Sequence, residues 1–315
     1  MKFQTPKALV VIGLIAGMVA VCQFIQCKTT KADKRNTPDM SGKTGDFDDD
    51  IEKNANDLFE KGKPVFRFDT FGDEVFWTDQ LQLHKAIADE KHGGIGKGLS
   101  PKDALAAGLK VDLGILPRFL RNRIRDGKFL DDPWVTLQLI KLNAVLGVVG
   151  KFDDDGNLKS IGLTCASCHS TVNHMSGIGK RLDGWPNRDL NVGAIISLTD
   201  NAKPIADMLH VDEPTLRNVL GRWGPGRYPA ILFMDGKAFK PDKSIAANLI
   251  PAAFGMKGVE YATYTGWGDI TYWNAFVANL EMHGKGRFRD HRLNDPRKYP
   301  IAVEQRFYDV NNTPD

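Results

Sequence analysis

The sequence predicts a mainly α-helical protein with long loops, in which a helical body follows an N-terminal apolar helix. Three observations lead to this prediction. Residues 8–25 are apolar apart from Gln23, and the cations Lys2 and Lys7 precede them. Several segments after residue 64 open with a helix-capping residue and continue with apolar residues at helical spacing. Only one pair of strands is evident among them.

The N-terminal apolar run is a signal peptide or a short uncleaved anchor, comprising residues 1–27. Residues 8–25, 18 positions in all, would form a helix of about 27 Å, just short of a ~30 Å hydrocarbon core. Ala20 and Cys22 make a weak cleavage site. We therefore expect an anchor that tethers the body to the inner membrane on its periplasmic side. Secretion after cleavage is the alternative.

The next segment, residues 28–63, is rich in Lys, Thr, Asp, Asn, Gly and Pro. Such a composition buries too little apolar surface to order itself, so a flexible linker is predicted. The folded body is expected at residues 64–315, with a helical lobe at 64–147 and a second part at 148–290 that carries the motif described below.

Capping residues and apolar spacing predict the helices of the body. After residue 147, two short apolar runs flank the sequence Asp153-Asp154-Asp155-Gly156-Asn157, which predicts a β-hairpin. The predicted helices cover residues 79–90, 100–108, 115–125, 132–145, 189–197, 203–210, 213–220 and 269–282.

The predicted helix at residues 115–125 carries four arginines: Arg118, Arg121, Arg123 and Arg125. A run of one charge is usually a solvated face. The functional alternatives are docking of an acidic redox partner and pairing with the carboxylates of a bound cofactor.

Five residues carry the chemistry of the chain: Cys165-Ala166-Ser167-Cys168-His169. The pattern C-x-x-C-H is the attachment sequence for a c-type haem. Two thiols at this spacing reach the two vinyl groups of one porphyrin, and the histidine that follows binds the iron as proximal ligand. Thioether attachment takes place outside the bacterial cytoplasm, which agrees with the N-terminal run. The expected cofactor is one covalent haem c, with its iron, per chain.

Two other interpretations of the cysteines are weaker. A redox dithiol belongs beside a βαβ unit, and none is evident. A zinc site needs two more Cys or His ligands at similar spacing, whereas the other cysteines, Cys22 and Cys27, lie in or beside the apolar run.

The ligand opposite His169 decides what the iron does. A methionine or histidine closes it for electron transfer, and an open position permits peroxide or oxygen chemistry. The sequence favours Met256, in the loop of residues 251–256, over Met234 and His283. The weaker candidates are His174, Met175, Met208, His210 and Met282.

The motif, together with residues 179–185 (GKRLDGW) and 223–227 (WGPGR), resembles exported bacterial proteins with cytochrome c domains. The group includes di-haem cytochrome c peroxidases and haem rubber oxygenases. The resemblance spans residues 130–290 and implies a cytochrome c-like helical haem domain, with an additional helical lobe before it. It assigns Cys165 and Cys168 as thioether sites and His169 as axial ligand. This chain has no second C-x-x-C-H, which speaks against a two-haem relay.

The sequence thus predicts a mono-haem c-type cytochrome that transfers single electrons in the periplasm. A peroxidase- or oxygenase-like enzyme with an open distal site is the alternative. A redox protein of the periplasm or membrane is the expected partner. Nucleic acid is not, because the chain after residue 27 has 40 basic and 39 acidic side chains.

Overall fold

The computed structural model describes residues 45–228, 247–256, 259–262 and 266–313. The chain divides into two units, residues 1–56 and 57–315. Helix α2, Gly45–Phe68, includes residues 45–63 of the predicted linker. Its side chains at residues 47–62 are exposed. A helix closes its own backbone hydrogen bonds, so this segment needs no buried face to be helical.

Within the described residues, no helix has both the length and the apolar character to cross a bilayer. Residues 8–25, the predicted signal or anchor, lie outside the described residues.

Side-chain caps begin the helices where the sequence placed them. In each case, a hydroxyl or carboxylate oxygen accepts a hydrogen bond from a backbone N–H of the first turn. The confirmed caps are Ser100 for α4 (Pro101–Ala106), Asp132 for α6 (Pro133–Lys141) and Asp269 for α12 (Ile270–Phe276).

The other predicted helices are also present, but several are shorter than expected. The segment predicted at 79–90 is divided between η1 (Val75–Gln80) and α3 (Leu83–Ile87), because Gln82 between them is left-handed, with φ of 54°. The remaining helices are α5 (Arg118–Arg125), α7 (Ala166–His169), α8 (Val192–Ile196), α9 (Lys203–Met208), α10 (Glu213–Trp223), η3 (Val277–Glu281) and α13 (Pro300–Glu304), with the short 3-10 turns η2 (Glu90–His92) and η4 (His291–Leu293).

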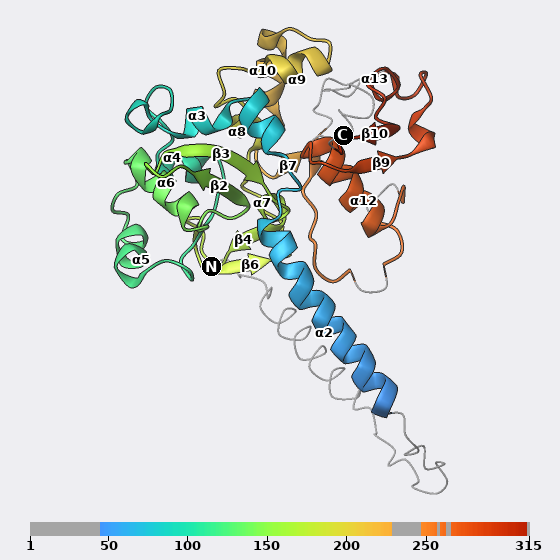
Figure 1. Ribbon diagram of the computed structural model, residues 1–315, viewed down its shortest axis with the longest axis horizontal. Coiled ribbons are helices and arrows are strands. Elements are labelled where there is room, and N and C mark those ends of the chain that lie inside the picture. The colour runs from blue at the N-terminus through green and yellow to red at the C-terminus, as the bar shows by residue number, and fades with distance from the viewer. Residues whose placement is uncertain (1–44, 229–246, 257–258, 263–265, 314–315) are drawn as a thin grey trace, which may run out of the picture. The chain divides into compact units, whose positions relative to one another are not determined.

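The described strands form five two-stranded sheets, four more than the sequence predicted. The predicted hairpin is confirmed: β2 (Val148–Phe152) pairs antiparallel with β3 (Leu158–Leu163), beside α3 and α6 (Figure 1). The other pairs are parallel β1 (Val111–Asp112) with β5 (Ile178–Gly179), and antiparallel β4 (Ser170–Val172) with β6 (Arg181–Asp183), β7 (Arg227–Tyr228) with β8 (Asn248–Leu249), and β9 (Arg287–Arg289) with β10 (Asp309–Asn311).

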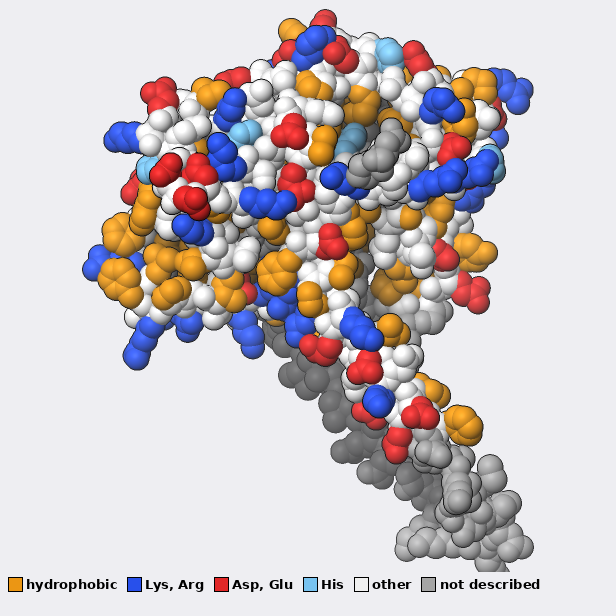
Figure 2. Space-filling view, viewed as in Figure 1, with side chains coloured by type: hydrophobic (Ala, Val, Ile, Leu, Met, Phe, Trp, Pro, Cys, Tyr) orange, Lys and Arg blue, Asp and Glu red, His pale blue; other side chains and the backbone are white. Residues whose placement is uncertain are grey.

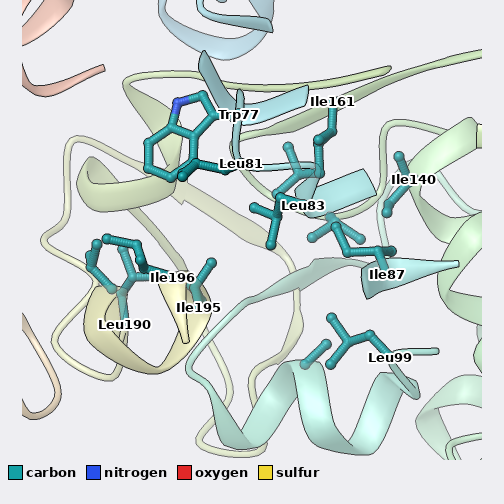
Figure 3. Close-up of a cluster of buried hydrophobic side chains, with 14 of the residues drawn as sticks. Trp77, Leu81, Leu83, Ile87, Leu99, Ile140, Ile161, Leu190, Ile195 and Ile196 are labelled. Carbon is teal, nitrogen blue, oxygen red and sulfur yellow. The ribbon is translucent and has the colours of Figure 1, made fainter. Parts of the chain in front are cut away.

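The larger hydrophobic core draws on both sides of the predicted boundary at residue 147. Figure 3 shows part of it, with Leu83 and Ile87 from α3 lying near Ile140 from α6 and Ile161 from β3. The division into lobes at 64–147 and 148–290 is therefore corrected, because the β2–β3 hairpin packs on α3 and α6 rather than beginning a new core.

A second hydrophobic core lies in the C-terminal part, around Phe276 of α12, Phe288 of β9 and Leu293 of η4. Phe276 is fully buried and meets Phe288 edge-on, with 5.5 Å between the ring centroids. The segment after Arg287 is mostly polar in sequence, yet it contributes Phe288, Leu293, Ala302 and Phe307 to a packed core.

Candidate functional site

The cysteine motif lies directly after β3 and forms the one-turn helix α7. Thr164 directly follows the strand, and its hydroxyl donates to the Arg67 carbonyl at 3.1 Å and accepts from the Ala166 N–H at 3.3 Å. The His169 N–H donates to the Cys165 carbonyl at 3.0 Å, closing the turn. This turn puts Cys165, Cys168 and His169 together in the wall of one cavity.

Gly147 supports the motif from the loop before β2. Its carbonyl accepts the Thr164 N–H at 3.0 Å and the Ser167 hydroxyl at 2.6 Å. It is left-handed, with φ of 74°, and a Cβ built on it would lie 2.0 Å from the Ser167 nitrogen. Only glycine lets the two backbones approach this closely.

Two turns after the motif satisfy its carbonyl groups. The buried Asn187 donates from its side chain to the Ser167 carbonyl at 3.3 Å, and from its N–H to the Cys168 carbonyl at 2.8 Å. The Gly184 N–H donates to the His169 carbonyl at 2.8 Å. Since buried carbonyl groups need partners, these contacts fix the orientation of the backbone at Ser167, Cys168 and His169.

The His169 imidazole has a partner of its own. Its Nδ1 lies 3.0 Å from the Pro251 carbonyl oxygen. A carbonyl only accepts, so Nδ1 carries the proton and Nε2 keeps its lone pair. Burial lowers the pKa of His169, and the bond to Pro251 opposes this effect without cancelling it. The ring is therefore a neutral imidazole whose Nε2 is ready to bind a metal ion.

Main-chain bonds bring Pro251 to His169 across a long stretch of sequence. Strand β8 pairs with β7, and the Ile250 N–H then donates to the Gly226 carbonyl at 2.8 Å. The Ala253 N–H donates to the Gly184 carbonyl at 2.8 Å. Pro251 is thus held between two anchored residues, and the second anchor is the turn that also binds the His169 carbonyl.

The cavity beside the motif has a volume of about 1460 Å³. This exceeds the ~300–1,000 Å³ of most small-molecule and cofactor sites. Its lining is mostly aliphatic and aromatic, with Trp267 and Trp273 on the C-terminal side. Trp267 lines the cavity, whereas Trp223 is buried in the larger core.

Both thiols are protonated in this setting. Burial raises the pKa of Cys165, and burial followed by the nearby Glu281 carboxylate raises that of Cys168 to about 12. Such thiols make poor metal ligands, because metals bind the thiolate. Within the described residues, no group of three or more His, Cys, Asp or Glu side chains is arranged to hold a metal ion.

The structure places the sixth-ligand candidates differently. Met256 and Met282 both line the cavity, and Met282 is the more buried. His283 stacks on Phe76, with 3.7 Å between the ring centroids, and is not part of the cavity lining among the described residues. The weaker candidates His174, Met175 and His210 are exposed, Met208 packs between the two cores, and Met234 lies outside the described residues.

Glu281 is an acidic side chain in the cavity wall that sequence reasoning missed. It is 8% exposed, and its Oε1 has no hydrogen-bond partner among the described residues. Burial raises the pKa of its carboxyl to about 8, so it is largely protonated at neutral pH. Tyr228 lies close by, since its hydroxyl donates to the Glu281 carbonyl at 3.3 Å. An acid at the end of the apolar face of a helix was the available signal in the sequence.

The residues present fit a covalently attached haem. The cavity supplies two thiols and a neutral imidazole on one wall and an apolar lining for a flat macrocycle. Lys285 lies where the lining meets solvent, and its side chain packs over Gly72, where a Cβ would lie 2.8 Å from Lys285 Cδ. An ammonium group at this place suits the carboxylates at the porphyrin edge.

Sequence reasoning identified the motif but not its supports. Pro251 was noted only as part of the loop that carries Met256, and Asn187 was not singled out. Their roles depend on contacts between residues far apart in the chain, 82 positions in the case of His169 and Pro251.

Comparisons of the chain with protein-family models, with curated proteins and with solved structures gave no match.

Proposed function

We propose that the protein is a c-type cytochrome with one haem, bound through Cys165 and Cys168, and that it transfers single electrons. The observation that carries this proposal is the bond between His169 Nδ1 and the Pro251 carbonyl at 3.0 Å. This bond holds the His169 ring neutral and leaves the lone pair of its Nε2 available. His169 is the residue that the C-x-x-C-H pattern assigns as the iron ligand. A histidine of a simple redox dithiol would have no need of this orientation.

The bound haem would supply an Fe(II)/Fe(III) couple, and the chain sets the conditions for it. Pro251 orients His169 and increases its basicity as a ligand. The apolar lining would keep water from the bound ring, and Lys285 would be available to pair with its carboxylates. Met256 is our candidate for the sixth ligand, and Met282, in the same cavity wall, is the alternative.

The cellular setting follows from the chemistry of attachment. Thioether formation outside the cytoplasm requires export, so we place the body in the periplasm, tethered by the apolar run at residues 8–25 or released after cleavage. The partner would then be a redox protein of that compartment or of the membrane, and nucleic acid is not a partner.

An absorption spectrum tests the proposal. The full chain would be produced in a host that attaches haem c and compared with a Cys165→Ser/Cys168→Ser variant. We expect haem that stays with the denatured polypeptide in the parent and not in the variant. A parent chain without covalent haem under these conditions would contradict the proposal.

A second candidate function is a haem enzyme that acts on peroxide or dioxygen. Glu281 favours it, because a buried protonated carboxyl beside the haem site can deliver or accept a proton. Carbon monoxide distinguishes the two functions. Rapid binding to the reduced protein indicates an open iron and supports the enzyme, whereas unchanged low-spin bands support the electron carrier.

A further inference from the structure

Helix α5 and the turn after it carry exposed aromatic rings among arginines. Phe119 is 67% exposed and Phe129 is 42% exposed. The Arg123 guanidinium lies over both rings, 4.9 Å from the Phe119 centroid and 5.3 Å from the Phe129 centroid. We propose that this surface, residues 118–129, binds the headgroup layer of a bilayer that contains anionic phospholipid. The proposal does not depend on the haem.

The rest of the helix explains why these rings face solvent. Ile124 is fully buried and attaches the helix to the body. The Arg121 guanidinium donates to the carbonyls of Gly114, at 3.3 Å, and Leu116, at 2.9 Å, which fixes the start of the helix. The face opposite Ile124 is thus held outward by a rigid support rather than by a loop.

The charge of the surface selects an anionic partner. Residues 118–128 contain five Lys or Arg and one acid, Asp126. Asp126 pairs with Arg125 at 3.6 Å, while Arg118 and Lys128 are exposed. None of the residues of α5 is in the lining of the haem cavity, so these arginines do not serve the carboxylates of the cofactor.

The mixture of rings and cations favours lipid over an acidic protein. The five Lys and Arg within residues 118–128 match the clusters of four to eight basic residues that bind anionic phospholipid. Figure 2 shows hydrophobic and basic side chains interspersed at the edge of the molecule where Figure 1 places α5. Segments that lie in the bilayer interface typically combine Lys or Arg side chains with aromatic rings.

Footprinting with hydroxyl radicals tests the proposal on the full chain. The chain would be reconstituted in bilayers of phosphatidylcholine alone or mixed with phosphatidylglycerol, and oxidation measured at single residues. Phe254, which is 49% exposed and lies outside the surface, is the internal reference. We expect Phe119 and Phe129 to be oxidised several-fold more slowly in the anionic bilayer, with Phe254 unchanged. A local readout is needed because the apolar run at residues 8–25 would hold the chain in either bilayer.

Charge reversal supplies the matched control. Arg118→Glu/Arg125→Glu should abolish the protection, since each basic residue near an anionic surface contributes about fivefold in binding. Arg287→Glu/Arg289→Glu changes the net charge equally on another exposed segment and should leave the protection intact.

Three results would overturn the proposal. Equal oxidation rates in neutral and anionic bilayers would remove the role of anionic lipid. Equal loss of protection in both double variants would reduce the effect to net charge. Protection by soluble polyglutamate as strong as that by the anionic bilayer would assign the surface to an acidic polypeptide instead.

Discussion

Replacing Gly147 by alanine tests whether a close backbone approach holds the Cys165–His169 motif in place. The new Cβ would lie 2.0 Å from the Ser167 nitrogen and 2.3 Å from its Cα, whereas non-bonded carbons prefer about 3.5–4.0 Å. The loop and α7 would have to separate by about 1.5 Å. That movement breaks the two hydrogen bonds that the Gly147 carbonyl accepts from Thr164 and Ser167.

Three contributions determine how far Gly147→Ala lowers the free energy of unfolding. A non-glycine residue in the left-handed region costs about 1–2 kcal/mol, and overpacking of a tight contact costs about 1–3 kcal/mol. The loss of two hydrogen bonds adds about 2 kcal/mol. Gly147→Ala should therefore lower the free energy of unfolding by about 5 kcal/mol, which is unusually large for one methyl group.

Gly156→Ala is the matched control. Gly156 is also left-handed, with φ of 85°, but a Cβ there would meet nothing within 4 Å. Gly156→Ala should therefore lower the free energy of unfolding only by the cost of a left-handed alanine, about 1–2 kcal/mol. Urea unfolding of the two variants and the parent, with equal m-values, gives the difference directly.

A difference of less than about 1 kcal/mol between the two variants would refute the reasoning, because it would show that α7 and the loop separate without cost. If Gly147→Ala fails to accumulate as soluble protein while Gly156→Ala does, the difference has the expected sign.

Three further predictions concern other parts of the site and the core. Burial raises the pKa of Asp73 to about 8, so the folded state binds a proton that the unfolded state releases near pH 4. Asp73 should therefore contribute a fall in the free energy of unfolding as pH rises from about 4 to 8, of about 3 kcal/mol between pH 5 and 7.5. In urea titrations, Asp73→Asn should reduce the slope by this amount and leave the slope that Glu281, with its pKa of about 8, contributes; an equal slope in both proteins would contradict the prediction. Of Met256→Ala and Met282→Ala, the one that removes the sixth ligand should convert a low-spin haem spectrum to high-spin, and a low-spin spectrum in both variants would exclude both residues. Asn187→Ala leaves the carbonyls of Gly108 and Ser167 without their buried donor and should destabilise the protein by about 2–3 kcal/mol, measured by thermal unfolding; Asn201→Ala, which loses one exposed bond to the Gln80 carbonyl, should stay within about 0.5 kcal/mol of the parent.

The sequence by itself determined the local elements and the spacing of the two cysteines and the histidine in the motif. Ser100, Asp132 and Asp269 each cap a helix because an N-cap depends only on the residue and the turn that follows it. The hairpin around Gly156 follows from local turn chemistry in the same way. The spacing of Cys165, Cys168 and His169 puts all three on one turn.

Tertiary structure alone decided what surrounds that turn. The bond from His169 to Pro251, the support from Gly147 and the two donors of Asn187 join segments far apart in the chain. The burial of Glu281 and the presence of both Met256 and Met282 in one cavity wall are equally non-local. A sequence pattern reports spacing along the chain, whereas pKa values and ligand geometry depend on which distant segments pack together.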